Sequence, residues 1–371
     1  MKKILLAAFV TAMMVSCSDS EDEPIVNPAP HYRAYVDKNL YCLSNDGGTF
    51  TIPVHANTTF RLERTLYVTG SGENTRRVDT SWLSYSDEHK RITPDASSDY
   101  TYNVQLSANL NTGLGRKAFL QVYADSVKND SNTIIEIRQN PRKLNESETI
   151  DLSDPFSLSL HVLLGNDTTN LERIKNLKIV GYVTDISLQY FAGLGNLSLD
   201  TLDLSDAYFG KYIDEIDREI ENRQFFKTRL HNISLPNDLA TIGEEAFAAC
   251  PNIETITIPS TVTRIRKRAF ANSSSMKSIV IPQDSKLKSL GSEAFNTGSV
   301  IESLFIPSTV YDLSPDALVG LQAKELHISL TTPPTMTGSI YSGCTLYVPK
   351  GCADKYKAAD YWKEYKNIVE E

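Results

Sequence analysis

The sequence has little positive charge and none of the short motifs that mark the commoner enzyme sites. Lys and Arg number 37 against 46 Asp and Glu, which gives a formal net charge of -9. Because nucleic-acid binding needs a cationic face that displaces counterions from phosphates, this balance argues against a nucleic-acid partner. The six histidines form no HExxH motif and no i, i+4 pair, and GxSxG, P-loop and GxGxxG motifs are absent. We therefore expect no enzyme, and no catalytic residue, cofactor or metal site.

Cysteine is also scarce, and none of the five residues forms a CxxC pair. This excludes the usual signals of zinc-ribbon and thioredoxin-like chemistry. Cys344 and Cys352 could form a disulfide in an oxidising compartment. We favour the alternative that both are buried free thiols, since cysteine often packs as a small hydrophobic residue.

The apolar run at the N-terminus, residues 4–15, follows Lys2 and Lys3 and is too short to span a bilayer. Its length suits the core of a signal peptide. Met14-Val15-Ser16-Cys17 resembles a bacterial lipobox, with Met14 where Leu is commoner. The resemblance implies that residues 1–16 are cleaved and that Cys17 carries a diacylglyceryl group. The alternative is a plain signal peptide with an incidental cysteine.

Residues 17–34 are polar and include the acidic run Asp19-Ser20-Glu21-Asp22-Glu23, which cannot pack in a core. We predict a flexible tether here. Acidic residues directly after the lipid cysteine also resemble the surface-export signal of Bacteroidetes lipoproteins. This implies a lipid anchor in the outer membrane, with the protein on the cell surface.

Residues 35–141 alternate apolar and polar side chains with a period of two, which is typical of strands with one buried face. Turn residues separate these strands, as in Asp46-Gly47-Gly48 and Asn111-Thr112-Gly113. Several short strands without a helical period predict a small antiparallel sandwich.

The same segment resembles a BACON domain, a Bacteroidetes-associated module with an immunoglobulin-like fold that often accompanies carbohydrate-active proteins. The resemblance rests on residues 43–52, 54–58 and 81–83, then Gly115-Arg116-Lys117-Ala118 and Ile137-Arg138-Gln139-Asn140. Phe60 stands near the place of a common aromatic residue, and the insert around residues 70–72 is unusual. Trp82 is a candidate for stacking on a sugar ring, and the alternative is that it packs inside the sandwich.

Residues 142–176 connect the sandwich to the next region and are mostly apolar around residues 156–164. Asp154-Pro155 suits a helix start, with Asp at the N-cap and Pro at the first helical position. We predict a short amphipathic helix that caps the following domain.

Residues 177–345 repeat with a period in the twenties. Pro236, Pro259, Pro282 and Pro307 each end an aliphatic-x-aliphatic-Pro segment and fall 23, 23 and 25 residues apart. A second landmark, Ala-Phe or Ala-Leu, ends at residues 247, 270, 295 and 318, with spacings of 23, 25 and 23. A fixed period of this size predicts a solenoid of stacked coils, with the aliphatic and Phe side chains inside.

These coils closely resemble the BspA-type leucine-rich repeat, most clearly in residues 242–250 and 256–270. Residues 346–371 resemble that family's C-terminal cap. Three departures are Arg266 in place of Gly, Leu318 in place of Phe, and an irregular stretch at residues 208–231. The stretch suggests an inserted helix, since Ile213, Ile216 and Ile220 have helical spacing. The predicted fold is mainly β, an N-terminal immunoglobulin-like β-sandwich followed by a leucine-rich-repeat solenoid with short parallel strands and few helices.

The strand residue between the two inward aliphatics should face outward and line up from coil to coil. The row is Lys178, Asp203, Ser234, Thr257, Val280, Phe305, His327 and Tyr347. Its last three members form a candidate aromatic strip for stacking on glycan rings or anchoring a protein partner. Alternatively, the cap around Trp362 folds over them.

Three functional hypotheses follow from the predicted anchor, sandwich and solenoid. In the first, the solenoid of a surface adhesion protein recognises another protein. In the second, a carbohydrate-binding lipoprotein of a glycan-utilisation system contacts sugar through the BACON-like domain or the aromatic strip. In the third, the sandwich is a spacer. We expect a monomer and no nucleic-acid partner.

Overall fold

In the computed structural model, contacts between residues divide the chain into two units. The first comprises Met1–Leu144 and Leu158–Leu171, and the second Asn145–Ser157 and Glu172–Glu371. The residues that the structure describes are 34–64, 68–69, 76–77, 80–85, 100–124, 133–153, 160–165, 167–183, 199–212, 215–216, 218–341 and 343–371. The predicted signal peptide and nearly all of the predicted tether lie outside them.

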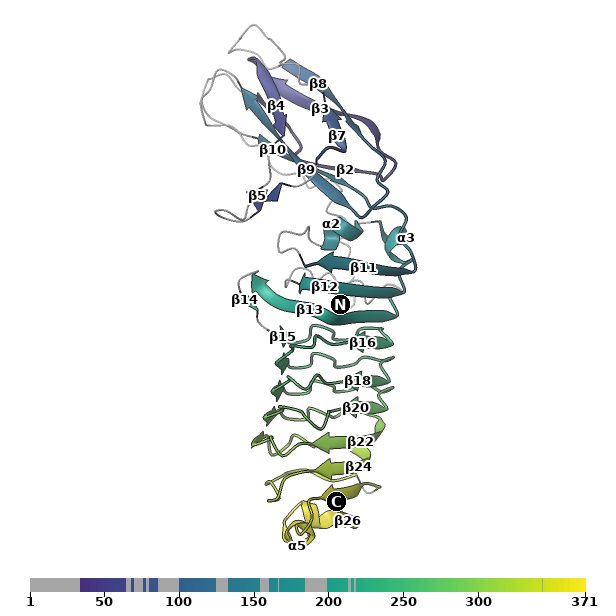
Figure 1. Ribbon diagram of the computed structural model, residues 1–371, viewed down its shortest axis with the longest axis vertical. Coiled ribbons are helices and arrows are strands. Elements are labelled where there is room, and N and C mark those ends of the chain that lie inside the picture. The colour runs from purple at the N-terminus through teal and green to yellow at the C-terminus, as the bar shows by residue number, and fades with distance from the viewer. Residues whose placement is uncertain are drawn as a thin grey trace, which may run out of the picture. The chain divides into compact units, whose positions relative to one another are not determined.

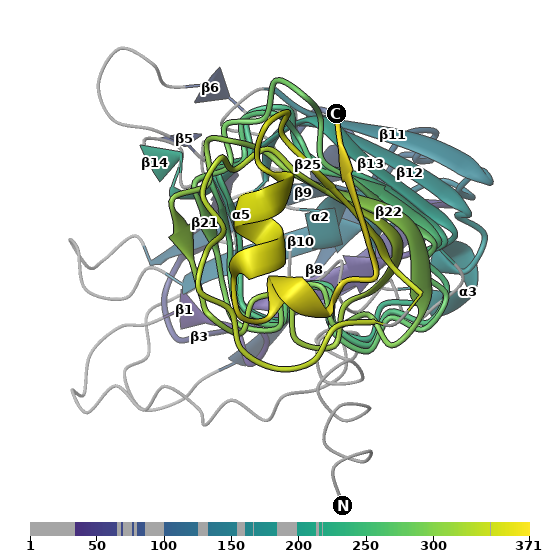
Figure 2. The same ribbon diagram turned by 90° about the horizontal axis from the view of Figure 1, so that it is seen from below.

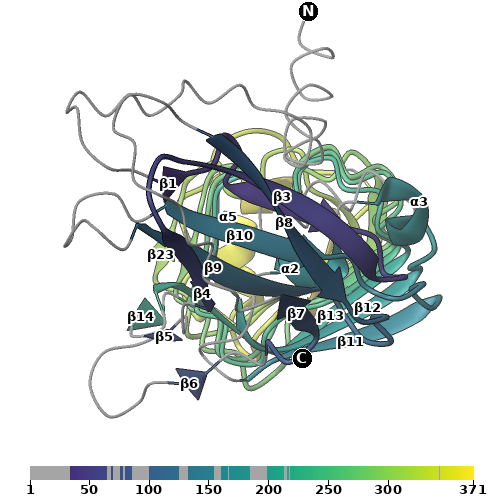
Figure 3. The ribbon, with the colours of Figure 1, turned by 90° about the horizontal axis from the view of Figure 1, so that it is seen from above.

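The first unit is a β-sandwich of two four-stranded sheets, and Figure 3 shows β3 and β8 of one sheet side by side. The first sheet has the order β1 (Ala34–Tyr35), β3 (Gly48–Ala56), β8 (Tyr100–Ala108) and β7 (Leu83–Tyr85). The second has the order β2 (Leu40–Leu43), β10 (Thr133–Gln139), β9 (Arg116–Ala124) and β4 (Phe60–Arg64). A separate short pair consists of β5 (Val68–Thr69) and β6 (Arg76–Arg77).

The core of the sandwich consists of the alternating apolar residues of the sequence. Ile52 and Val54 of β3, Leu120 and Val122 of β9, and Ile137 of β10 are fully buried. All strand pairs in the two sheets are antiparallel except that of β2 with β10, which is parallel. The predicted antiparallel sandwich is thus confirmed.

In the described part of residues 142–176 there are two short helices, whereas the sequence predicts one capping helix. These are α2 (Leu160–Leu164) and α3 (Thr168–Leu171), and both belong to the first unit. The Gly115 amide donates to the Leu163 carbonyl oxygen of α2 at 2.6 Å, and the Leu144 amide donates to the Asn170 side chain of α3 at 2.7 Å. The predicted helix start at residues 154–155 lies outside the described residues.

The second unit is a parallel β-solenoid, and Figure 1 shows the strands of its long ladder stacked one above another. This ladder begins before the predicted residue 177 and continues beyond residue 345. Its strands are β11 (Ser147–Leu152), β12 (Asn176–Val183), β13 (Thr201–Tyr212), β16 (Asn232–Ser234), β18 (Thr255–Thr257), β20 (Ser278–Val280), β22 (Val300–Ile306), β24 (Gln322–Ile328), β25 (Thr345–Val348) and β26 (Asn367–Glu370).

A second, shorter ladder runs along the other side of the coils. Its strands are β15 (Glu219–Ile220), β17 (Thr241–Ile242), β19 (Arg264–Ile265), β21 (Ser289–Leu290) and β23 (Asp312–Leu313). The inserted helix suggested for residues 208–231 is wrong for the part that the structure describes. There β13 pairs with β14 (Glu215–Ile216), and Ile220 pairs with Ile242 as the inward residue of β15.

The interior of the coils contains a stack of phenylalanine rings. Phe225, Phe247, Phe270 and Phe295 follow one another with ring centroids 5.2, 5.7 and 6.1 Å apart and planes within 6° of parallel. Ile256 and Ile258 are buried on the strand side, whereas Thr257 between them is exposed. This confirms the predicted inside and outside positions, since alternate residues of a strand point to opposite faces.

Arg266 stands at the coil position that Gly243 and Gly291 occupy on the two adjoining coils. A Cβ atom at Gly243 would lie 2.6 Å from the Ile220 carbonyl oxygen, and one at Gly291 would lie 2.5 Å from the Lys267 nitrogen. Glycine is thus required on both adjoining coils, and Arg266 between them extends to Glu219, with Nη1 and Oε1 2.9 Å apart.

The C-terminal end of the coils is closed by α5 (Ala353–Ala358) and the 3-10 helix η1 (Trp362–Glu364), which lie across it in Figure 2. The fully buried Trp362 donates a hydrogen bond from Nε1 to the Pro334 carbonyl oxygen at 2.7 Å. Tyr356 is also fully buried and donates to the Leu330 carbonyl oxygen at 2.8 Å. Polar atoms of both rings are therefore satisfied where they are buried.

Candidate functional site: an aromatic strip on the long ladder

The aromatic strip consists of Phe305, His327 and Tyr347, which come from β22, β24 and β25. Parallel pairing places Phe305 opposite His327, and His327 opposite Tyr347. The His327 and Tyr347 rings stack with centroids 4.3 Å apart and planes 6° apart. The three side chains predicted to lie together are therefore neighbours on one outward face.

Each member of the strip is half-buried, while the residues on either side along its strand are buried inside the coil. Trp362 and Tyr356 of the cap are themselves inside the coil end. The cap therefore adds to the interior, and the strand β26 continues the outward face with Val369 opposite Tyr347. Because Val369 is 42% exposed, the strip ends at a solvent-accessible apolar side chain.

Carboxylates border the strip at its histidine. Nδ1 of His327 lies 3.0 Å from a carboxylate oxygen of Glu371, and its Nε2 lies 3.5 Å from Glu325. The His327 side chain is 25% exposed. The ring is therefore fixed by stacking on Tyr347 and by carboxylates at both nitrogens, which lowers the entropy that a ligand would have to remove on binding.

The other end of the outward row is polar. The ammonium of Lys178 lies 2.7 Å from Asp206 and 3.5 Å from Asp203. The hydrogen bond with Asp206 raises the pKa of Lys178, so this charge is paired on the outward face. Ser234, Thr257 and Val280 follow as small exposed side chains.

Sequence reasoning missed a second aromatic group on this ladder, the tyrosine pair Tyr182 and Tyr208. These residues lie opposite each other on β12 and β13, with ring centroids 5.9 Å apart. Tyr208 is 45% exposed. On both strands the pair lies beyond the row that begins at Lys178. In the regular coils the corresponding residues belong to the turn that follows the strand.

Trp82, the candidate in the sandwich, is 3% exposed and belongs to the core of the first unit. The Arg116 guanidinium lies over its ring, 4.7 Å from the centroid. Its ring is thus packed within the protein, as in the alternative stated for it, and is not presented to a sugar.

The cysteines of the second unit do not form a reactive site. Cys250, Cys344 and Cys352 are free and buried, so the structure contains no disulfide between Cys344 and Cys352. Burial raises the pKa of Cys344 to about 12 and that of Cys250 to about 12. A thiol with such a pKa is protonated near neutral pH and is a poor nucleophile.

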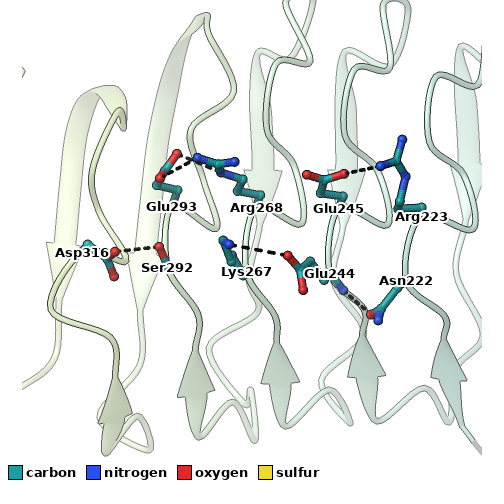
Figure 4. Close-up of polar contacts among 9 residues, drawn as sticks. All are labelled: Asn222, Arg223, Glu244, Glu245, Lys267, Arg268, Ser292, Glu293 and Asp316. Atoms are coloured by element: carbon teal, nitrogen blue, oxygen red, sulfur yellow. Dashed lines mark hydrogen bonds and ion pairs between the residues drawn. The ribbon is translucent and has the colours of Figure 1, made fainter. Parts of the chain in front are cut away.

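Figure 4 shows a polar ladder across the turns that follow the short strands. Arg223, Glu245, Arg268 and Glu293 occupy equivalent turn positions with φ of 61°, 53°, 53° and 52°. Their signs alternate, and the pairs contact across coils: Arg223–Glu245 at 3.2 Å, Lys267–Glu244 at 3.7 Å, Arg268–Glu293 at 3.0 Å and Ser292–Asp316 at 2.7 Å. The hydrogen bond from Arg268 lowers the pKa of Glu293. Because each of these charges has an opposite charge on the adjacent coil, we interpret the polar ladder as a set of contacts between coils and not as a ligand site.

Over the described parts of the chain, no group of three or more His, Cys, Asp or Glu residues is arranged to hold a metal ion. None of the helices that the structure describes is both long and apolar enough to cross a membrane.

The repeats match a family model. Residues 218–346 match the BspA type leucine rich repeat region in six copies. This part of the chain is a BspA-type leucine-rich-repeat region. The matched residues run from the first short strand, β15, to β25, and they include the whole phenylalanine stack. No curated protein sequence matches the chain.

Among solved structures, a leucine-rich repeat protein from Bacteroides ovatus is 16% identical, with a TM-score of 0.33, and the match covers 54% of this chain and 55% of that chain. A PapD-like domain of human CEP192 is 9% identical, with a TM-score of 0.24 and coverage of 34% and 97%. A Bacteroides ovatus xyloglucanase in complex with a heptasaccharide is 11% identical, with a TM-score of 0.22 and coverage of 47% and 45%. The chain thus spans about half the length of the Bacteroides ovatus repeat protein. The BACON assignment of residues 35–141 stays a prediction.

Proposed function

We propose that this protein is a non-catalytic binding and adhesion lipoprotein of the bacterial cell surface, whose repeat unit recognises a protein or glycan ligand through the aromatic strip. The observation that carries the proposal is the alignment of Phe305, His327 and Tyr347 on adjacent outward positions. The equivalent positions upstream have Ser234, Thr257 and Val280, so the coil does not require aromatic residues there. Clustered, partly exposed aromatics are typical of binding hot spots.

Replacing all three residues of the strip by serine should lower the affinity for the ligand by roughly 30-fold or more, since a hot spot is worth at least about 2 kcal/mol. The full chain is first screened on arrays of glycans and of immobilised proteins, and binding constants are then measured for the probes that bind. Thermal stability should change little, because the strip faces outward.

A matched control places the same kind of change on the short ladder. Thr241→Ser, Arg264→Ser and Asp312→Ser alter outward positions of β17, β19 and β23. This variant should bind as the unaltered protein does. Equal affinity of the strip variant and the unaltered protein would move the binding surface elsewhere. Unfolding of the strip variant would mean that the three rings support the fold.

The anchor of the proposed lipoprotein is a lipid on Cys17. The support for it is the apolar run at residues 4–15, followed by Ser16 and Cys17. Cys17→Ala should release the protein from the membrane fraction and abolish incorporation of a labelled fatty acid. Ser18→Ala is the control and should keep both. A Cys17→Ala protein that stays in the membrane, together with an unlabelled natural protein, would refute lipidation at this residue.

A further inference from the structure

Three central strands of the long ladder, β16, β18 and β20, have no ionisable side chain among their outward residues. We call this area the neutral face; it consists of the outward residues of β16, β18 and β20. They are Asn232, Ser234, Thr255, Thr257, Ser278 and Val280. All are exposed except Ser278, which is half-buried. Hydroxyl and amide groups thus dominate a surface of a protein in which 22% of the residues are charged.

Aromatic residues lie beyond both edges of the neutral face, and the tyrosine pair is also displaced along its strands, since Asp203 and not Tyr208 lies opposite Ser234. On one side β13 pairs with β16, and the ring of Tyr208 on β13 lies beside that of Tyr182, with the planes tilted by 39°. On the other side β20 lies beside β22, which carries Phe305. From β13 to β22 the ladder advances by four strands, so the two aromatic groups are separated by at least about 19 Å at the usual spacing of about 4.8 Å.

Charged groups that border the neutral face are already paired. Lys277 contacts Glu254 at 2.7 Å directly before β20 and β18. On the neighbouring strands, Lys178 contacts Asp203 and Asp206, and Lys324 contacts Glu302 at 2.8 Å. A charged ligand lying on the face would lose hydration without gaining a counter-charge. The neutral face also has no large apolar side chain in a desolvated pocket, and such a side chain is the usual centre of a protein–protein hot spot.

From these features we infer that the ligand is a neutral, extended polysaccharide that lies across the neutral face and stacks sugar rings on both the aromatic strip and the tyrosine pair. This inference rests on the proposed function of the strip and adds the ligand class and a second contact. Sugar rings present apolar C–H faces that pack on aromatic rings, and their hydroxyl groups exchange hydrogen bonds with Ser, Thr and Asn. A span of about 19 Å requires several rings in one chain.

The test compares long and short neutral ligands. Full-length protein is titrated calorimetrically with a panel of neutral polysaccharides (a glucan, a mannan and a xylan) and with polygalacturonate and heparin as charged ones. At least one neutral polysaccharide should bind and the charged ones should not. Tyr182→Ser with Tyr208→Ser should weaken binding of that polysaccharide about tenfold. The same variant should leave unchanged the binding of its disaccharide, which is too short to reach both aromatic groups.

Two further variants separate the possible causes of a loss. Tyr311→Ser removes a tyrosine that is 80% exposed beside the short ladder, and it should bind normally. Tyr208→Ser alone removes only the more exposed member of the pair, and it serves if the double variant fails to fold.

The outcomes that overturn the inference differ from those that overturn the proposed function. Polysaccharide binding that is insensitive to both tyrosine variants would remove the second contact but leave the strip in place. Binding only to charged polysaccharides or only to a protein would refute the ligand class, and so would a complete lack of binding to the neutral panel. Polysaccharide binding that survives the serine variant of the strip would refute the proposed function itself.

Discussion

Replacing Phe270 by alanine should lower the free energy of unfolding of the second unit, the solenoid, by about 3–5 kcal/mol, as for other large core truncations. Phe270 is fully buried and stacks on both neighbours, Phe247 at 5.7 Å and Phe295 at 6.1 Å. The truncation would leave a cavity between two coils whose positions are fixed by backbone hydrogen bonds. The Phe270 amide donates to the Ala294 carbonyl oxygen, and the Phe247 amide donates to the Ala269 carbonyl oxygen. The site therefore has little freedom to collapse around the missing ring.

Thr257→Ala is the matched control, since it changes an exposed residue of the adjoining strand. It should alter the unfolding free energy by no more than about 0.5 kcal/mol. Urea denaturation followed by tryptophan fluorescence in a Trp82→Phe background reports on the repeats, because Trp362 is then the remaining tryptophan and belongs to the second unit. Equal effects of the two changes on the Trp362 transition would contradict the inside and outside positions assigned to the strands.

The regular coils could be predicted from sequence because two independent landmarks recur with the same period. Each coil needs a residue that ends the strand and a ring that fills the interior, and Pro and Phe supply these at nearly fixed positions. Gly243 and Gly291 are also required by the coil, because backbone atoms of the preceding coil would lie within 2.6 Å of a Cβ atom at either position. Once the inward aliphatics were assigned, the alternation of side chains along a strand placed Phe305, His327 and Tyr347 outside.

The coil of β11 could not be predicted in the same way because it lacks these landmarks. β11 has only Ile150 and Leu152 as inward aliphatics, and the residue directly after Leu152 is not Pro as it is in the regular coils. The isoleucines at 216 and 220 fit both a helical spacing and separate short strands. A usable signal was present, since Ile220 and Phe225 stand 22 residues before Ile242 and Phe247. That offset nearly equals the period and identifies one more coil.

The chemistry around the strip was only partly predictable. Stacking of His327 on Tyr347 follows from their register on adjacent strands. The contact of His327 with Glu371 spans 44 residues and depends on β26 extending the ladder after the cap. Tyr182 and Tyr208 were missed because the strands that carry them, β12 and β13, are longer than those of the regular coils. The outward face therefore extends beyond the row that the repeat pattern defines.

Trp362→Ala should also destabilise the repeat unit by about 3–5 kcal/mol, because Trp362 closes the end of the coils. The ring is fully buried, with Tyr356 edge-on at 5.3 Å and Tyr365 stacked at 5.9 Å. Terminal caps of solenoids shield an apolar interior that would otherwise promote association. The alanine variant should therefore also aggregate at lower protein concentration, as measured by light scattering, whereas its unfolding is followed by far-ultraviolet circular dichroism.

Trp362→Phe separates the packing of the ring from its hydrogen bond. Phenylalanine keeps most of the buried apolar surface but loses the Nε1 donor to the Pro334 carbonyl oxygen. A buried acceptor without a partner costs about 1–3 kcal/mol, so this variant should fall between the unaltered protein and the alanine variant. Tyr311→Ala, at an 80% exposed side chain, should have almost no effect. If Trp362→Ala is no more destabilising than Tyr311→Ala, the end of the solenoid must be closed by other residues, because an interior left open to water would lose the burial that stabilises the last coils.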